Sequence, residues 1–273
     1  MELKQLPLTS EDRAALQPVA DRLSRLVAVA VTNLVHDATY KPVPRSRMDR
    51  AVKAKLQDAY ELARQRLISA EDHLRSILTL LGPNSMLPSF SMFTLIRGAS
   101  VATIHARHLL DPIIDEGTRL GRALSVRLVN LEQQQKVHPE TQGSHFDDRV
   151  EHLRYRAETN GVAVNRNRNV AITGFGDGWP SDTDLFEKYM PGIGKTYFQY
   201  LSGYAHSLPW AQLPISRAQA SDDPDIAVIP TDVKVPVLAA VLNGALGLYD
   251  ETVGFILGHA GYPADVWAAV KKG

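Results

Sequence analysis

The sequence contains no cysteine, so disulfide frameworks, thiolate nucleophiles and zinc sites built on cysteine are excluded. It also lacks an excess of charge of either sign, because 30 lysine and arginine residues balance 30 aspartate and glutamate residues. A neutral chain has no overall field that attracts a polyanion or an anionic membrane, so a nucleic-acid partner would need a local basic patch. Without cysteine nothing in the sequence opposes a reducing compartment, and we expect a cytoplasmic location by default.

Long apolar runs are missing as well. No stretch of about 18 apolar residues occurs, and residues 1–17 carry charges where a signal peptide has its apolar core. We therefore expect a soluble protein with no membrane partner and no targeting segment. Its 273 residues are enough to bury a full core without a metal or a disulfide.

Apolar residues recur at spacings of three and four through most of the chain, which is the period of an α-helix. Thr9 and Ser10 are suited to cap a first helix, and we expect residues 1–45 to hold a peripheral N-terminal helix. A very long helix is expected over residues 46–81. Further helices are expected over residues 89–110, 112–135, 146–160, 181–190, 195–208 and 235–258.

Two segments depart from this pattern. Residues 162–180 carry Asn, Gly and Pro around a short β-like run, which predicts an irregular or hairpin excursion. Residues 209–233 are rich in Pro, Asp and Ser and predict a long surface loop. The sequence therefore predicts an all-α bundle of about seven or eight helices, forming a single domain over residues 1–273.

The last predicted helix contains glycines at positions 244, 247 and 254. Glycine inside a helix costs up to about 1 kcal/mol relative to alanine, so its presence indicates close packing against a neighbour. That neighbour is either another helix of the bundle or a second copy of the chain, and the oligomeric state stays open.

The segment GIGKT, residues 192–196, is similar to a nucleotide-binding loop. Such a loop needs a glycine five residues before the GK pair and a strand that leads into it. Tyr189 stands at the glycine position, and the preceding residues have the pattern of a helix. We therefore expect a helix start, at which Lys195 and free backbone N–H groups can hold an anion.

The predicted helix that follows has two strips. Phe198, Leu201, Ala205 and Leu208 form an apolar strip. Lys195, Gln199, Ser202 and His206 form a polar strip, turned from the first by about 110 degrees. A polar strip at the margin of the core is more often the edge of a solvated face, and it is also consistent with the lining of a cleft. Ser202 and His206 stand one turn apart, but no nucleophile elbow or orienting carboxylate accompanies them.

The helix over residues 89–110 carries further candidates. Leu95, Ala99, Ala102, Ala106 and Leu109 form a face suited to tight helix contact. Arg97, His105 and His108 lie together on the opposite side, with one histidine expected to be exposed and the other at the edge of the core. His105 and His108 lack the glutamate of a metal-binding motif, so no metal and no cofactor are expected.

Several of these segments together resemble a family of uncharacterised all-helical proteins from high-GC bacteria. The likeness covers most of residues 55–260 and rests on AEDHLRSILTLL, TLIRGASVATIHARHLLDP, the helix start at Pro180, Ser181 and Thr183, and YFQYLSGYAHSLPW. The resemblance implies a glutamate near position 101 and a tryptophan near position 108, where this chain has Val101 and His108. It implies no settled activity.

The segment from Tyr197 to His206 is also similar to the terminal helix of HEPN-type ribonucleases. The resemblance implies a histidine and an arginine that meet on one helix at the scissile phosphate. No arginine stands in the turn before His206. A nuclease would therefore need Arg97 or Arg122 to reach in from another helix.

These observations favour a protein that binds a ligand or partner in a partly polar interhelical cleft. The expected ligand contacts are Arg97, His105, Lys195, Gln199, Ser202 and His206. The alternatives are a metal-independent ribonuclease of HEPN type, with His206, Ser202 and Arg97 as its catalytic candidates, and a biosynthetic enzyme that acts on a small molecule in an enclosed pocket. Whether the protein is an enzyme stays open.

Overall fold

The computed structural model describes residues 9–28, 41–82, 88, 90–137, 144–208, 219–220, 227–228 and 234–270. These residues form ten helices and two small two-stranded sheets, which confirms the all-α class. Of the surface loop expected over residues 209–233, only strands β3 (Gln219–Ala220) and β4 (Ala227–Val228) are among the described residues. No helix in the described ranges has both the length and the apolar character needed to cross a membrane.

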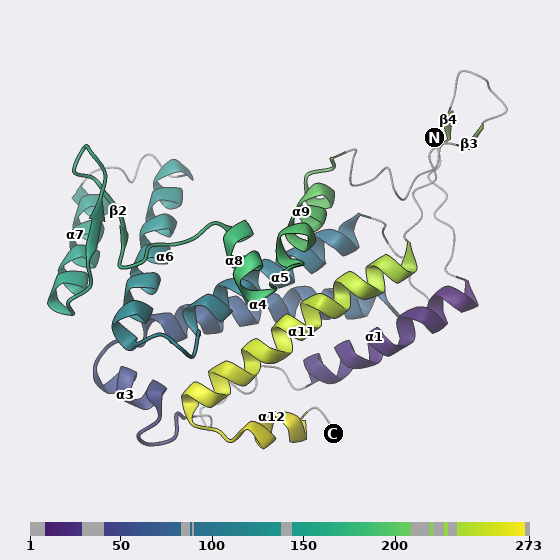
Figure 1. Ribbon diagram of the computed structural model, residues 1–273, viewed down its shortest axis with the longest axis horizontal. Coiled ribbons are helices and arrows are strands. Elements are labelled where there is room, and N and C mark those ends of the chain that lie inside the picture. Colours follow the sequence, from purple (N-terminus) through teal and green to yellow (C-terminus); the bar gives the residue numbers. More distant parts are fainter. Residues whose placement is uncertain are drawn as a thin grey trace.

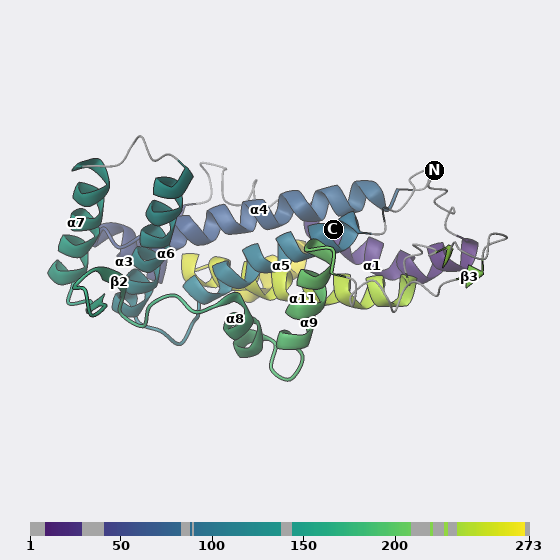
Figure 2. The same ribbon diagram turned by 90° about the horizontal axis from the view of Figure 1, so that it is seen from above.

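Four long helices run side by side and give the molecule its elongated body (Figures 1 and 2). They are α1 (Ser10–Ala28), α4 (Asp58–Leu80), α5 (Ser91–Leu109) and α11 (Val235–Ala260). Helix α5 is the central one, since it contacts α4, α11 and three other helices. The expected cap of α1 is present, because the Thr9 hydroxyl oxygen accepts a hydrogen bond from the backbone N–H of Asp12 over 3.1 Å.

The prediction of a single helix over residues 46–81 is wrong, because this range holds two helices, α3 (Arg47–Lys53) and α4. Lys55 adopts the left-handed conformation with φ of 58°. The backbone N–H of Leu56 then bonds the carbonyl of Ala51 over 2.8 Å, and that of Lys55 bonds the carbonyl of Val52 over 3.1 Å. This is the Schellman ending of a helix, in which lysine occupies the position that glycine usually takes.

A smaller core lies at one end of the body, where α6 (Glu116–Val137) and α7 (Ser144–Thr159) stand beside a hairpin (Figure 1). The hairpin pairs β1 (Val164–Arg166) with β2 (Ile172–Phe175), which confirms the excursion expected over residues 162–180. Ser125 of α6 holds it, because the serine hydroxyl donates to the carbonyl of Phe175 over 3.1 Å and accepts from its N–H over 2.9 Å.

Two short helices, α8 (Asp182–Tyr189) and α9 (Gly194–Ala205), pack against each other and against α5. Ser181 caps α8, as the sequence predicts, by accepting a hydrogen bond from the N–H of Asp184 over 3.2 Å. The turn between them is tight, since a Cβ atom at Gly194 would lie 2.0 Å from the carbonyl oxygen of Phe186. GIGKT is therefore a helix–helix turn, and α8 stands where a nucleotide-binding loop would need a strand.

The chain ends in α11 and the short helix α12 (Ala264–Val270). The split of the long helix into α3 and α4 adds one helix and α12 adds another, so the described residues form ten helices rather than seven or eight. The expected close packing at glycines holds at Gly244, where a Cβ would lie 3.1 Å from the ring of Tyr197. At Gly254 a Cβ would meet nothing within 4 Å in the described part of the chain, so packing within the bundle does not account for this glycine.

Candidate functional site

Arg97 reaches from α5 to α9. Its Nε donates a hydrogen bond to the hydroxyl oxygen of Ser202 over 3.1 Å, and its guanidinium carbon lies 5.5 Å from the ring centroid of Phe198. Arg97 and Ser202 are both half-buried. Within the described part of the chain, no hydrogen bond or ion pair occupies the two terminal nitrogens of Arg97. A guanidinium held in this way can donate two parallel hydrogen bonds to a carboxylate or phosphate.

His105 lies two turns further along α5 and contacts α8. Its Nε2 lies 2.7 Å from Oδ1 of Asp182, the first residue of that helix. The hydrogen bond from His105 lowers the pKa of the Asp182 carboxyl, against the effect of burial and with help from the charges of His105, Arg97 and Arg66. Asp182 therefore stays ionised in reach of the field of Arg97.

Helix α4 flanks the same part of α5 on the other side. The ring of His73 covers Gly98, since a Cβ at that glycine would lie 2.6 Å from Nε2 of His73. Arg66 lies about two turns earlier on α4, and its charge also lowers the pKa of Asp182. The side of α5 between α4 and the α8–α9 pair is left incompletely covered. We call this set of half-buried and exposed residues the α5 strip: Thr94, Arg97, Gly98, Val101 and His105.

The polar residues of α9 that the sequence singles out do not all join this strip. Ser202 does, through Arg97, whereas Lys195, Gln199 and His206 are exposed. His206 follows the last helical residue of α9, one turn beyond Ser202. The structure thus brings Arg97, His105 and Ser202 to one margin of the bundle and leaves the other three along its solvent side.

The apolar face of α9 differs from the expected one. Leu201 is buried as expected, but the other fully buried side chain is Tyr204, which stacks on Phe93 of α5 at 4.0 Å between ring centroids. Leu208 is 40 % exposed because α9 ends at Ala205. Ser207 takes a left-handed φ of 54° there, and the N–H of Leu208 bonds back to the carbonyl of Gly203 over 2.8 Å.

His108 is not on the α5 strip, which corrects the expectation that it lies beside Arg97 and His105. It is 1 % exposed, and its Nδ1 lies 3.0 Å from the hydroxyl of Tyr189. That hydroxyl donates to Asp111 over 2.9 Å, and Lys188 donates to the same carboxylate over 3.1 Å. Burial, followed by the charge of Arg122, lowers the pKa of His108 to about 3, so the ring is neutral.

This buried cluster ties α5 to α8 and to α6. Arg122 donates to Asp177 over 2.8 Å and lies 3.8 Å from Asp111. No periodic signal in the sequence marks Tyr189 or Asp182 as polar contacts, because each reaches its partner across the fold. Among the described residues, no group of three or more His, Asp or Glu side chains is placed to hold a metal ion.

Comparisons with protein-family models, with curated proteins and with solved structures find no match to this chain. The resemblance across residues 55–260 and the likeness of the α9 segment to HEPN-type ribonucleases therefore stay predictions. Geometry alone supports a function for the α5 strip.

Proposed function

We propose that the protein binds an anionic ligand along the α5 strip, with Arg97 as the principal contact. The observation that carries the proposal is the guanidinium of Arg97. Ser202 and Phe198 fix its orientation, while its terminal nitrogens have no partner among the residues described. An arginine that is oriented before binding loses less side-chain entropy when it forms paired hydrogen bonds to a carboxylate or phosphate.

The charges around the strip favour an anion. Arg66 and Arg97 are two permanent cations near the carboxylate of Asp182, and the ring of His73 can add a hydrogen-bond donor. A cationic ligand would face the two guanidinium groups, whereas an anion meets them in a half-buried setting where the attraction is screened less than at an exposed surface.

The exposed residues of α9 extend the proposed contact. Lys195, Gln199 and His206 can meet a larger ligand, or the acidic side chain of a protein partner, after its anionic group reaches Arg97. A cytoplasmic location and packing between copies of the chain stay predictions from the sequence.

Ligand binding is tested by titrating the protein with inorganic phosphate, citrate and a nucleoside monophosphate in an isothermal calorimeter. At least one of these anions is expected to bind saturably, and Arg97→Gln is expected to weaken it about tenfold or more through the lost charged hydrogen bonds. Arg25→Gln is the matched control, since Arg25 is an exposed arginine on α1. Equal affinities for the wild type and the Arg97→Gln variant would contradict the proposal.

A metal-independent ribonuclease is the second candidate, and one observation favours it. Arg97 reaches α9 at Ser202, one helical turn before His206, which supplies an arginine from another helix near the histidine. In such an enzyme His206 would act as general base and Arg97 would stabilise the charge that develops on the phosphate.

Incubation of the purified protein with total RNA and EDTA tests this candidate. Cleavage is expected to disappear in His206→Ala and in Arg97→Ala, and to persist in His145→Ala, which alters an exposed histidine of α7. The nuclease is excluded if the wild type does not cleave RNA, or if cleavage persists in His206→Ala. The binding proposal is then tested by the calorimetry alone.

A further inference from the structure

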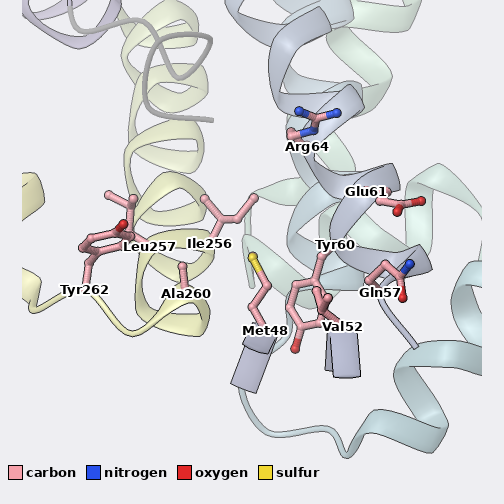
Figure 3. A pocket seen from close by; sticks show the side chains of 10 residues that line it. All are labelled: Met48, Val52, Gln57, Tyr60, Glu61, Arg64, Ile256, Leu257, Ala260 and Tyr262. Atoms are coloured by element: carbon pink, nitrogen blue, oxygen red, sulfur yellow. The ribbon is translucent and has the colours of Figure 1, made fainter. Parts of the chain in front are cut away.

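A cavity of about 190 Å³ lies where α3, the first turns of α4 and the end of α11 meet. None of its lining residues belongs to the α5 strip. Figure 3 shows the side chains around it. They are Met48, Val52, Gln57, Tyr60, Glu61, Arg64, Ile256, Leu257, Ala260 and Tyr262.

Tyr60 forms a fixed wall of this cavity. Its hydroxyl donates to Oε1 of Glu116 over 3.0 Å, so the polar end of the side chain is already satisfied. The guanidinium carbon of Arg119 lies 5.4 Å from its ring centroid, and the ring of His259 meets it edge-on at 5.5 Å. The ring carbons of Tyr60 are therefore what the side chain offers to a bound molecule, and three neighbours hold them in place.

Most of the apolar lining comes from two other helices. Met48 and Val52 belong to α3, and Ile256, Leu257 and Ala260 belong to α11. In Figure 3, Met48, Ile256 and Tyr60 converge from three elements on the same space. A thioether and an aromatic ring both make favourable contacts with a second aromatic ring, at about 5 Å for sulfur and in offset or edge-on stacking for the ring.

The position of α3 relative to α11 is fixed, so the cavity is present before any ligand binds. The N–H of Val43 bonds the carbonyl of Ala260 over 2.8 Å. Gly261 ends α11 with φ of 89°, and a Cβ there would lie 2.9 Å from the Cβ atoms of Ser46 and Val43. This close approach, which requires glycine, clamps the start of α3 against the end of α11. Binding to such a preformed site costs little ordering of the protein.

The polar residues of the lining are Gln57, Glu61 and Arg64. The carboxylate of Glu61 is half-exposed, and its ion pair with Arg127 is long at 3.8 Å. A half-exposed carboxylate among the lining residues can accept a hydrogen bond, so the lining fits a ligand that donates one.

We infer that this cavity binds a small single-ring aromatic molecule that carries a hydrogen-bond donor. The volume of the cavity limits the size of the ligand to about one ring. An engineered apolar cavity of about 150 Å³ accommodates benzene, whereas drug-sized ligands need roughly 300 Å³ or more. The apolar walls with Met48 and Tyr60 favour an aromatic ligand, and the carboxylate of Glu61 favours one that donates a hydrogen bond. This inference is independent of anion binding at the α5 strip.

Phenol is the probe. Cyclohexanol, which has a similar size but no aromatic ring, is the comparison ligand. Titration followed by NMR is expected to give saturable phenol binding in roughly the millimolar range, as suits a ligand of this size. The methyl signals of Met48 and Ile256 are expected to shift, and cyclohexanol is expected to bind more weakly. No saturation by phenol, shifts confined to other methyl groups, or equal affinity for cyclohexanol would overturn the inference.

Val52→Trp fills the cavity from a side chain that is 48 % exposed, so it need not disturb the core. It is expected to weaken phenol binding about tenfold or more. Val129→Trp, at a side chain of α6 that is 40 % exposed, is the matched control and is expected to leave the affinity unchanged. Circular dichroism checks that both variants fold, and a folded Val52→Trp variant that keeps the wild-type affinity would place phenol elsewhere.

Discussion

Arg97 and Ser202 lie 105 residues apart in the sequence, yet Nε of the arginine donates a hydrogen bond to the serine hydroxyl oxygen over 3.1 Å. The bond links the central helix α5 to α9. Ser202→Ala is expected to lower the free energy of unfolding by about 1 kcal/mol, because a bond from a charged donor is lost while the guanidinium stays half-buried. Urea denaturation followed by circular dichroism measures the change.

Ser76→Ala is the matched control for that variant. The hydroxyl of Ser76 donates only to the carbonyl of Asp72 within α4, so its loss is expected to change the free energy of unfolding by no more than about 0.5 kcal/mol. Equal losses of unfolding free energy in the two variants would contradict this prediction. The hydrogen bond between α5 and α9 would then contribute no more than the hydroxyl of Ser76 does.

His108 makes the stability of the fold sensitive to acid. Its ring stays neutral in the folded protein down to about pH 3, since burial lowers its pKa, whereas in the unfolded chain it binds a proton below about pH 6.5. The unfolded state therefore holds more protons in this window, and stability falls as the pH falls from about 6.5 to about 3, by up to roughly 1.4 kcal/mol per pH unit.

In His108→Gln this contribution is absent, so the free energy of unfolding is expected to decline less steeply between pH 6.5 and pH 4, as denaturant titrations at each pH would measure. His145→Gln, at an exposed histidine, is expected to keep the wild-type slope. A slope that His108→Gln leaves unaltered would contradict the burial of a neutral ring at this position.

Asp58 joins the start of α4 to α6 and α7. It is 6 % exposed, and its carboxylate accepts from Arg156 over 2.7 Å and lies 2.9 Å from Arg127. Asp58→Asn is expected to lower the free energy of unfolding at pH 7 by about 2 kcal/mol, because two partly buried guanidinium groups lose their counter-ion. Thermal and urea unfolding measure the loss, and Asp21→Asn, at an exposed position of α1, is expected to change it little.

The same carboxylate adds a second dependence on pH. Burial would raise the pKa of Asp58, but the hydrogen bond and charge of Arg156 and the charge of Arg127 outweigh it and lower the pKa. The contribution of Asp58 is therefore complete above its unfolded pKa of about 3.9 and is lost as the pH falls through its lower folded pKa. Asp58→Asn is expected to show a flatter acid limb below about pH 4, and a limb as steep as that of the wild type would refute this assignment.

Two glycines of the bundle are expected to respond to alanine in opposite directions. Gly194→Ala places a Cβ 2.0 Å from a backbone oxygen of α8, so the α8–α9 turn must move, and a loss of several kcal/mol is expected. Gly258→Ala meets nothing within 4 Å inside α11 and is expected to raise the stability by up to about 1 kcal/mol. The melting temperatures of the two variants measure both effects. A change of the same sign in both variants would contradict the surroundings described for these two glycines.

Local signals in the sequence predict the parts of this fold that local interactions build. Thr9 and Ser181 mark helix starts because each bonds an N–H three residues later. The break between α3 and α4 escapes prediction because Lys55 takes a left-handed conformation without the glycine that would announce it. The spacing of apolar residues continues across that break. This spacing indicates only which side of a helix is apolar, so it does not reveal where one helix ends and the next begins.

The candidate site is predictable only in part for a similar reason. Helical spacing places Arg97 and His105 on the same half of one helix and Ser202 on the margin of another. The partners that orient them, such as Asp182 for His105, come from elements whose approach only the packed core fixes. The burial of His108 likewise depends on α8, whose Tyr189 covers it.

Helix α1 packs along α11, although the two helices are far apart in the sequence. Arg22 of α1 lies 3.7 Å from Asp250 of α11. During synthesis on a ribosome, α4 and α5 can pair soon after they emerge, because they are neighbours in the chain and form a local hairpin. Leu23 of α1, which the finished fold covers completely, belongs to a core that α4 and α11 both build, and of these two helices α11 is made later. The nascent chain thus keeps part of the apolar face of α1 uncovered until α11 has emerged, and during that interval this face is open to non-native contacts.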